Sequence, residues 1–260
     1  MGILNVTPDS FSDGGLYFRE KDAINRALQL EEEGADIIDI GGESTRPYSK
    51  PVKINEELKR VIPVIRKLVK KIKIPISIDT YKSEVARCAL EEGASLVNDI
   101  SALRQDKRLV EVVKKYNVPV VLMHMKGSPQ NMQDNPRYKD VVSEVINFLR
   151  KRIEYLKTNG IKEDNIIIDP GVGFGKTKAH NLEILNRLDE FKALERPILI
   201  GTSRKSFIRK VLNLEVDERV FGTAATVAVS IMKGAHIVRV HDVKAMRQVS
   251  ILTDAILNLN

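Results

Sequence analysis

The chain has 260 residues, which is long for one ordinary domain and short for two. It is 43% hydrophobic and 30% charged, a balance that excludes a disordered chain. Its formal net charge of +7 suggests an anionic partner without identifying one. No uncharged apolar stretch reaches the ~18–20 residues of a membrane span, and the single cysteine, Cys88, is typical of a reducing cytosol. We therefore expect a cytoplasmic protein that binds no membrane.

Short apolar runs bounded by turn residues predict eight strands. In chain order they are Gly2–Val6, Asp36–Ile40, Pro75–Asp79, Ser95–Asp99, Pro119–Met123, Ile166–Asp169, Pro197–Gly201 and His236–Val240. Most are apolar almost throughout, as parallel strands covered on both faces require.

Amphipathic stretches between these runs predict helices. They include Asp22–Glu33, Asn55–Lys71, Lys82–Glu92, Lys139–Thr158 and Phe221–Lys233. Three of them end in a glycine that can close a helix in the left-handed conformation, namely Gly34, Gly93 and Gly234. Strand and helix alternate without an intervening linker, so the sequence predicts one (β/α)8 TIM barrel domain over residues 1–260, with a doubly wound open sheet as the alternative.

Polar side chains stand where the predicted strands end, which is where a barrel builds its active site. Asp79, Asn98 and Asp169 end three otherwise apolar runs. Converging there, they would be costly to desolvate without a ligand. Carboxylates and an amide suit the edge of a fused heterocycle such as a pterin or purine. Thr80 is better explained as a cap of the next helix.

A second set of strand-end residues is typical of a phosphate or carboxylate site. Its members are cations and hydroxyls: Ser44, Thr45, Arg46, Ser203, Lys205, Ser206, Arg239 and His241. Two of them could instead have a purely structural role, because Arg46 could pair with Glu43 and His241 could be a core histidine.

The segment Gly171–Thr177 looks like a phosphate-binding loop but has Pro170 where the Walker pattern needs glycine. We interpret Lys176 as facing solvent and Phe174 as a wall of the pocket. The histidines show no paired spacing for zinc. An oxygen-preferring Mg²⁺, held by one side chain, water and a substrate phosphate, is compatible with Asn5.

The basic run Lys59–Lys73 carries an apolar helical stripe and lacks interleaved aromatic residues. It is therefore an ordinary solvated helix surface, and we expect no nucleic acid partner.

Taken together, the strand-end motifs resemble the dihydropteroate synthase family of pterin-binding (β/α)8 enzymes over essentially the whole chain. The segments that carry the resemblance are 2–15 (GILNVTPDSFSDGG), 41–47 (GGESTRP), 78–80 (IDT), 98–100 (NDI), 169–176 (DPGVGFGK), 202–207 (TSRKSF) and 239–243 (RVHDV).

The resemblance implies a transferase of folate biosynthesis that joins 7,8-dihydropterin-6-ylmethyl diphosphate to 4-aminobenzoate, is a sulfonamide target, uses Mg²⁺ and forms a homodimer. Departure of diphosphate would precede attack of the arylamine, so no protein nucleophile is needed.

The resemblance also assigns roles to residues of this sequence. Asp79, Asn98 and Asp169 match the pterin edge, with Lys205 beside the ring and Met123 and Phe174 lining the pocket. Asn5 matches the Mg²⁺ ligand. Thr45, Arg239 and His241 match the diphosphate site. Ser206, Pro47 and Phe11 match the aminobenzoate site, and Asp9, Asp13 and Arg46 lie on loops that close over it. The catalytic set implied is Asp13, Arg46, Asp79, Asp169 and Lys205.

The sequence departs from the family pattern at two positions, because Tyr48 and Arg209 stand where glycine is expected. Three other functions stay open. They are a corrinoid-dependent methyltransferase of the same pterin-binding group, a Schiff-base aldolase with Lys205 as nucleophile, and a basic nucleic-acid-binding module. We expect Asp169→Asn to weaken pterin binding and Lys176→Ala to have little effect.

Overall fold

The structure is a computed structural model that describes residues 1–7 and 16–258, apart from the side chains of residues 16–19 and 217. Its strands are β1 (Gly2–Asn5), β2 (Ile38–Gly41), β3 (Ile76–Asp79), β4 (Leu96–Asp99), β5 (Val120–Met123), β6 (Ile166–Asp169), β7 (Leu199–Ile200) and β8 (Ile237–Val238). Each lies at, or within one residue of, a predicted run, so all eight strand predictions are confirmed.

The helices are α1 (Leu16–Glu32), α2 (Ile54–Leu68), α3 (Ser83–Glu91), α4 (Leu109–Tyr116), α5 (Val141–Thr158), α6 (Lys178–Asn186), α7 (Ser206–Leu212), α8 (Val220–Met232) and α9 (Val243–Leu257). Short 3₁₀ turns are η2 (Glu163–Asn165), η3 (Leu188–Leu194) and η4 (Val216–Glu218). The five predicted helices are present. Gly34, Gly93 and Gly234 have φ of 95°, 106° and 98°, as the predicted helix endings require.

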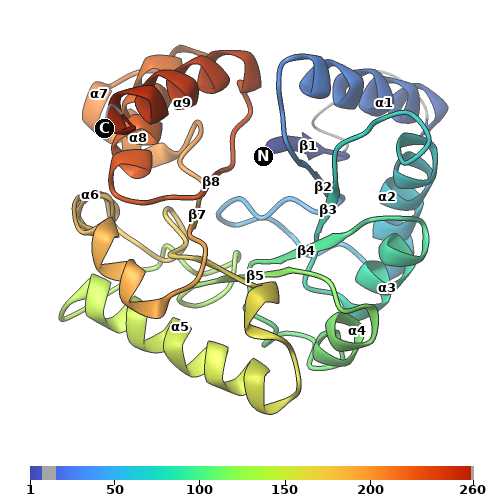
Figure 1. Ribbon diagram of the computed structural model, residues 1–260, viewed down its shortest axis with the longest axis horizontal. Helices are drawn as coiled ribbons and strands as arrows, with labels where there is room; N and C mark the ends of the chain where they lie inside the picture. The colour runs from blue at the N-terminus through green and yellow to red at the C-terminus, as the bar shows by residue number, and fades with distance from the viewer. Residues whose placement is uncertain (8–15, 259–260) are drawn as a thin grey trace.

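The strands form a closed parallel barrel inside a ring of helices (Figure 1). Strands β1 to β6 make one sheet in chain order, and β7 pairs with β8. Two parallel bridges, Gly2 to Val240 and Ile168 to Ile198, join the two sheets at both edges. The predicted (β/α)8 barrel is therefore confirmed and the open sheet is excluded.

The barrel has apolar packing on both faces of its strands. Residues between strands and helices form the main core, which includes Ile78, Val97 and Leu122. A smaller cluster contains Leu96, which precedes Val97, and Val121, which precedes Leu122. Because successive strand residues point to opposite faces, the smaller cluster fills the barrel interior.

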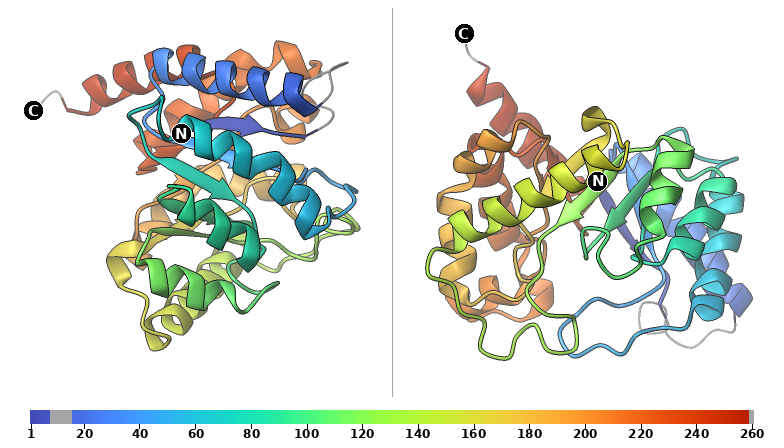
Figure 2. Two further views of the ribbon diagram at one scale, coloured as in Figure 1. Left: turned by 90° about the vertical axis from the view of Figure 1, so that its right-hand side faces the viewer. Right: turned by 90° about the horizontal axis from the view of Figure 1, so that it is seen from below.

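The same alternation directs the strand-end residues. Asn98 follows Leu96 by two positions, Met123 follows Val121, and Asp169 follows Ile167, which also belongs to the interior cluster. These side chains therefore enter the barrel mouth. In Figure 2 the β1 and β3 arrows point toward the end of the molecule where the loops after β2 and β5 gather.

Within residues 1–7 and 16–258, none of the helices is long and apolar enough to cross a bilayer.

Candidate active site

A polar network of four side chains occupies the barrel mouth. The Arg239 guanidinium, just after β8, donates from Nε to Asp39 Oδ2 at 2.6 Å and from Nη2 to Asp79 Oδ2 at 2.7 Å. Asn98 Nδ2 donates to the same Asp39 oxygen at 3.0 Å. Strands β2, β3 and β4 and the segment just after β8 thus each supply one member, and the predicted residues Asp79, Asn98 and Arg239 are brought together.

Asp39 is a member of this network that we did not predict as a site residue. It is fully buried, and its Oδ1 has no hydrogen-bond partner among the described residues. The available signal was an acid inside the apolar run Ile37–Ile40. Its role could not be deduced because its cation lies 200 positions away.

Near neutral pH, both the charged and the neutral form of the Asp79 carboxyl are populated. Burial raises the pKa of Asp79 to about 7, against the lowering effect of Arg239. The Asp79 carboxyl can therefore either accept or donate a hydrogen bond near neutral pH.

A second carboxylate, Asp169 at the end of β6, lies within electrostatic reach of Lys205, which stands at the start of α7. Asp169 Oδ1 accepts from the Gly171 N–H at 2.7 Å. Burial raises the pKa of Asp169, and the Lys205 ammonium opposes that rise. Burial also lowers the pKa of Lys205 to about 8, with Asp169 limiting the fall. The Lys205 ammonium donates to the Val172 carbonyl.

An apolar wall borders these charged groups. The Phe174 ring lies under the Lys205 ammonium, with 4.5 Å between Nζ and the ring centroid. Met123 belongs to a buried cluster with Ile100, Met125 and Met132, against which Phe174 packs. The structure therefore brings both predicted wall residues into one apolar cluster, with Phe174 beside Lys205.

The residues predicted to bind the anionic end of a ligand include two, Ser203 and His241, that lie near Arg239. His241 Nδ1 lies 3.0 Å from Ser203 Oγ, and the Ser203 hydroxyl accepts from the His241 N–H at 3.1 Å. Burial, together with the nearby guanidinium groups of Arg239 and Arg204, lowers the pKa of His241 to about 4. His241 is thus a neutral imidazole in the site, where it can donate one hydrogen bond to an anion.

Two further predicted residues lie on the loop after β2. Thr45 is half-buried, and Arg46 is exposed, close enough to contribute to the lowered pKa of His241. Arg46 does not pair with Glu43, which is engaged by Lys82 instead. Ser206 is exposed at the start of α7. The predicted residues Asp9, Phe11 and Asp13 lie outside the described residues.

Asn5 ends β1 at the same mouth and is half-buried. Its side-chain amide forms no hydrogen bond with the residues that the structure describes, which leaves an oxygen donor available. In that part of the chain, there is also no group of three or more histidine, cysteine or acidic side chains that could enclose a metal. The residues present therefore fit a Mg²⁺ that takes one protein oxygen and fills its other positions with water and phosphate.

A family model for pterin binding enzymes matches residues 1–241. The dihydropteroate synthase of Clostridium beijerinckii is 49% identical, covering 98% of this chain and 93% of its own length. That of Bacillus subtilis is 47% identical, covering 99% and 88%. This chain belongs to the dihydropteroate synthase family of pterin-binding enzymes.

Solved structures of the dihydropteroate synthase family agree. The Xanthomonas albilineans enzyme with 4-aminobenzoic acid has a TM-score of 0.94 at 45% identity, covering all of this chain and 93% of its own. The Clostridium difficile enzyme, in the presence of pteroic acid, has a TM-score of 0.93 at 50% identity, covering 98% and 95%. The Yersinia pestis enzyme in a sulfonamide complex has a TM-score of 0.94 at 42% identity, covering 98% and 93%.

Two turn residues have structural roles. The Asp99 carboxylate accepts from the Ser101 and Leu103 N–H groups at 2.7 and 2.6 Å, so it shapes the turn after β4. Thr80 Oγ1 accepts from the Lys82 N–H at 3.2 Å, at the start of α3. Tyr48, where the dihydropteroate synthase pattern expects glycine, has φ of 65°, in the left-handed region that glycine favours.

The prediction that Lys176 faces solvent is wrong. Lys176 is only 3% exposed, and its ammonium lies 2.9 Å from His124 Nδ1. It donates to the carbonyls of Gly171 and Phe174 at 2.9 and 3.0 Å. Burial lowers the pKa of Lys176 well below its usual range, and Asp169 opposes that fall. Lys176 therefore fixes the loop that carries Phe174.

The buried position of Lys176 adds an expectation for the stability of Lys176→Ala, which our prediction about pterin binding did not cover. The substitution removes a buried side chain and leaves carbonyls without a donor, so it should lower the free energy of unfolding by about 2–4 kcal/mol. Urea denaturation measures the change. Lys178→Ala, at an exposed position on α6, is the control and should stay within about 0.5 kcal/mol of the unsubstituted chain. Equal midpoints for the two variants would contradict this role.

Proposed function

We propose that this chain joins 7,8-dihydropterin-6-ylmethyl diphosphate to 4-aminobenzoate, giving dihydropteroate and diphosphate, through the residues at the barrel mouth. The observation that carries this assignment is the set formed by buried Asn98 and Asp169 and by Asp79, whose side chain is 11% exposed, beside two cations, Arg239 and Lys205. It supplies acceptors for a flat heterocycle on one side and positive charge for an anion on the other.

The pterin end of the substrate fits the interior of the mouth. Carboxylates accept hydrogen bonds from the amino group and ring N–H of a pterin, and the Asn98 amide can both donate and accept. The ring would lie against Phe174 and Met123. In this position the carboxylates also stabilise the positive charge that develops on the pterin methylene when its bond to oxygen breaks.

The diphosphate end fits the groups that follow β8 and those on the loop after β2. When the methylene C–O bond breaks, the electron pair leaves with diphosphate, and Arg239, Arg46, Thr45 and the His241 imidazole can hold the resulting anion. The arylamine nitrogen then forms the new C–N bond and loses a proton to solvent water. Lys205, near the ring, accepts no covalent bond in this scheme.

Mg²⁺ is part of the proposal, with Asn5 as its protein ligand. Bound with water and the diphosphate, the ion would offset negative charge on the leaving group. The single cysteine, Cys88, supports a cytosolic location for this activity.

We also propose that the protein is a homodimer that pairs through α8 and α9. These helices pack together (Figure 1), and α8 carries no charged residue. Phe221 is 83% exposed, and Met232, Leu252 and Ile256 are each more than half exposed. An apolar face of this kind on neighbouring helices is typical of a subunit interface, and a second copy would bury it.

The activity is tested by diphosphate release from the pterin diphosphate. Release should require Mg²⁺ and rise when 4-aminobenzoate is added. Asp169→Asn should weaken pterin binding about 10-fold or more, because the ring loses a charged acceptor. Folded enzyme that binds pterin but releases no diphosphate would contradict the proposal.

The pH dependence follows from two groups with opposite requirements. Asp79 must lose its proton to accept from the pterin, and burial raises its pKa to about 7, so kcat/KM should rise through that pH. Lys205 must keep its proton, and burial lowers its pKa to about 8, so kcat/KM should fall above that pH. The profile should be a narrow bell. Asp79→Asn should remove the acid limb alone, and a variant that retains both limbs would refute this assignment.

The dimer is tested by sedimentation equilibrium. Phe221→Glu should convert a dimer to a monomer because it places charge in an apolar interface. Tyr155→Glu on α5, at another exposed aromatic residue, is the matched control and should remain dimeric. A monomeric unsubstituted chain, or a dimeric Phe221→Glu variant, would show that this face does not pair.

A further inference from the structure

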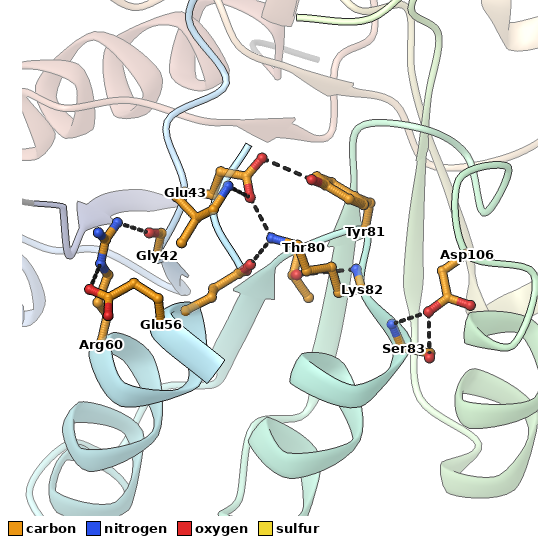
Figure 3. A network of polar contacts seen from close by, with 11 residues as sticks. Gly42, Glu43, Glu56, Arg60, Thr80, Tyr81, Lys82, Ser83 and Asp106 are labelled. Carbon is orange, nitrogen blue, oxygen red and sulfur yellow. Dashed lines mark hydrogen bonds and ion pairs between the residues drawn. The ribbon is translucent and has the colours of Figure 1, made fainter. Parts of the chain in front are cut away.

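Three buried charged side chains lie behind the loop after β2, and the proposed chemistry uses none of them. Lys82, before α3, forms an ion pair with Glu43 of the loop (Figure 3) and a second with Glu57 of α2. The side chains of Lys82, Glu43 and Glu57 are 9%, 6% and 1% exposed. We call these three residues the Lys82 cluster.

Glu43 uses both carboxylate oxygens to connect the loop to its surroundings. Oε1 accepts from the Tyr81 hydroxyl at 3.0 Å. Oε2 accepts from the Val52 N–H at 3.0 Å and also receives Lys82. Glu43 therefore ties the start of the loop to its end at Val52 and to the connection between β3 and α3.

The neighbouring backbone is held just as closely. Arg60 Nη1 donates to the Gly42 carbonyl at 2.8 Å. A Cβ on Gly42 would lie 2.8 Å from Val61 and 2.9 Å from Glu57, so the loop passes over α2 without room for a side chain. Farther along, Ser49 Oγ donates to the Ser44 carbonyl at 2.6 Å.

Thr45 and Arg46 lie between these anchors. Burying three charges is costly, and apolar side chains of similar volume often give equal or greater stability. An ion-pair cluster differs from an apolar one because its charged groups find their hydrogen-bond partners in only a few geometries. Such a cluster is therefore suited to fixing one conformation of the loop rather than to adding stability.

We propose that the ion pair between Glu43 and Lys82 is a positioning device that fixes the loop at residues 43–52, so that Thr45 and Arg46 are directed toward the diphosphate of the substrate, whereas Glu57 only balances the charge of Lys82 from α2. Glu43 and Lys82 are positioning residues and do not touch the substrate. The proposal rests on the proposed function of Thr45 and Arg46, and one arm of its test does not depend on that function.

The test compares Glu43→Ala with Glu57→Ala. Each variant removes one buried carboxylate from Lys82, but only Glu43 belongs to the loop, so Glu57→Ala is the matched control. Glu43→Gln and Glu57→Gln keep the hydrogen-bonding oxygen and provide a milder pair if an alanine variant does not fold.

The first readout is hydrogen exchange of the Val52 amide without substrate. Glu43→Ala should accelerate it about tenfold or more, Glu43→Gln should have a smaller effect, and both Glu57 variants should match the unsubstituted chain. This arm is valid even if the enzyme releases no diphosphate, so failure of the proposed function is distinguishable from failure of the cluster.

The second readout separates the two ends of the substrate. Glu43→Ala should raise KM for the pterin diphosphate about tenfold, and Kd for a pterin without diphosphate should not change, because the pterin-edge residues are on other strands. Glu57→Ala should leave KM within about twofold. If both glutamate variants shift exchange and KM alike, or if neither shifts them, the proposal is wrong.

Discussion

The structure depends on the balance of charge at the barrel mouth, where Arg239 is shared by Asp39 and Asp79. Carboxylates that end parallel strands point inward and lose most of their water, which is costly unless a cation replaces that water. One guanidinium, just after β8, supplies hydrogen bonds to β2 and β3 together. The arrangement leaves Asp79 with a pKa raised by burial, and so leaves it ready for a ligand that donates hydrogen bonds.

The same interaction contributes to closing the barrel. Strands β7 and β8 have two residues each, and single bridges connect their sheet to β1 and β6. Arg239 crosses one of these junctions through its ion pairs, and Lys205 crosses the other by donating to the carbonyl of Val172, which follows β6. The two cations that face the substrate therefore also join the short sheet to the long one, and their loss should affect stability as well as turnover.

Local pattern in the sequence was sufficient to locate every strand, because parallel barrel strands are apolar runs with turn residues at both ends. Alternation along those strands also directed Asn98, Met123 and Asp169 into the mouth. Prediction failed where a partner is remote in the chain. Asp39 gains its role from Arg239, 200 positions away, and Lys176 is buried against His124, 52 positions away. The Gly171 and Phe174 carbonyls that also receive Lys176 are near in the chain, but only the folded loop turns them toward its ammonium. Helices α4, α6, α7 and α9 were also absent from our named helices. Among them, α6 has a recognisable Thr177 cap but little amphipathic character.

The two ends of the substrate site are built on supports of different kinds. The pterin end uses strand termini, whose positions are fixed by the sheet, whereas Thr45 and Arg46 lie on a loop that needs its own anchors. One anchor is Glu43 with Lys82. Another is the loop after β5, where the Pro129 carbonyl accepts from the Tyr48 N–H at 2.8 Å. Tyr48 bears the cost of a left-handed backbone at this contact, so the loop conformation is imposed by its surroundings and not by local preference. A loop held in this way can be displaced without disturbing the strand ends, and for that reason pterin binding and diphosphate binding should be separable by mutation.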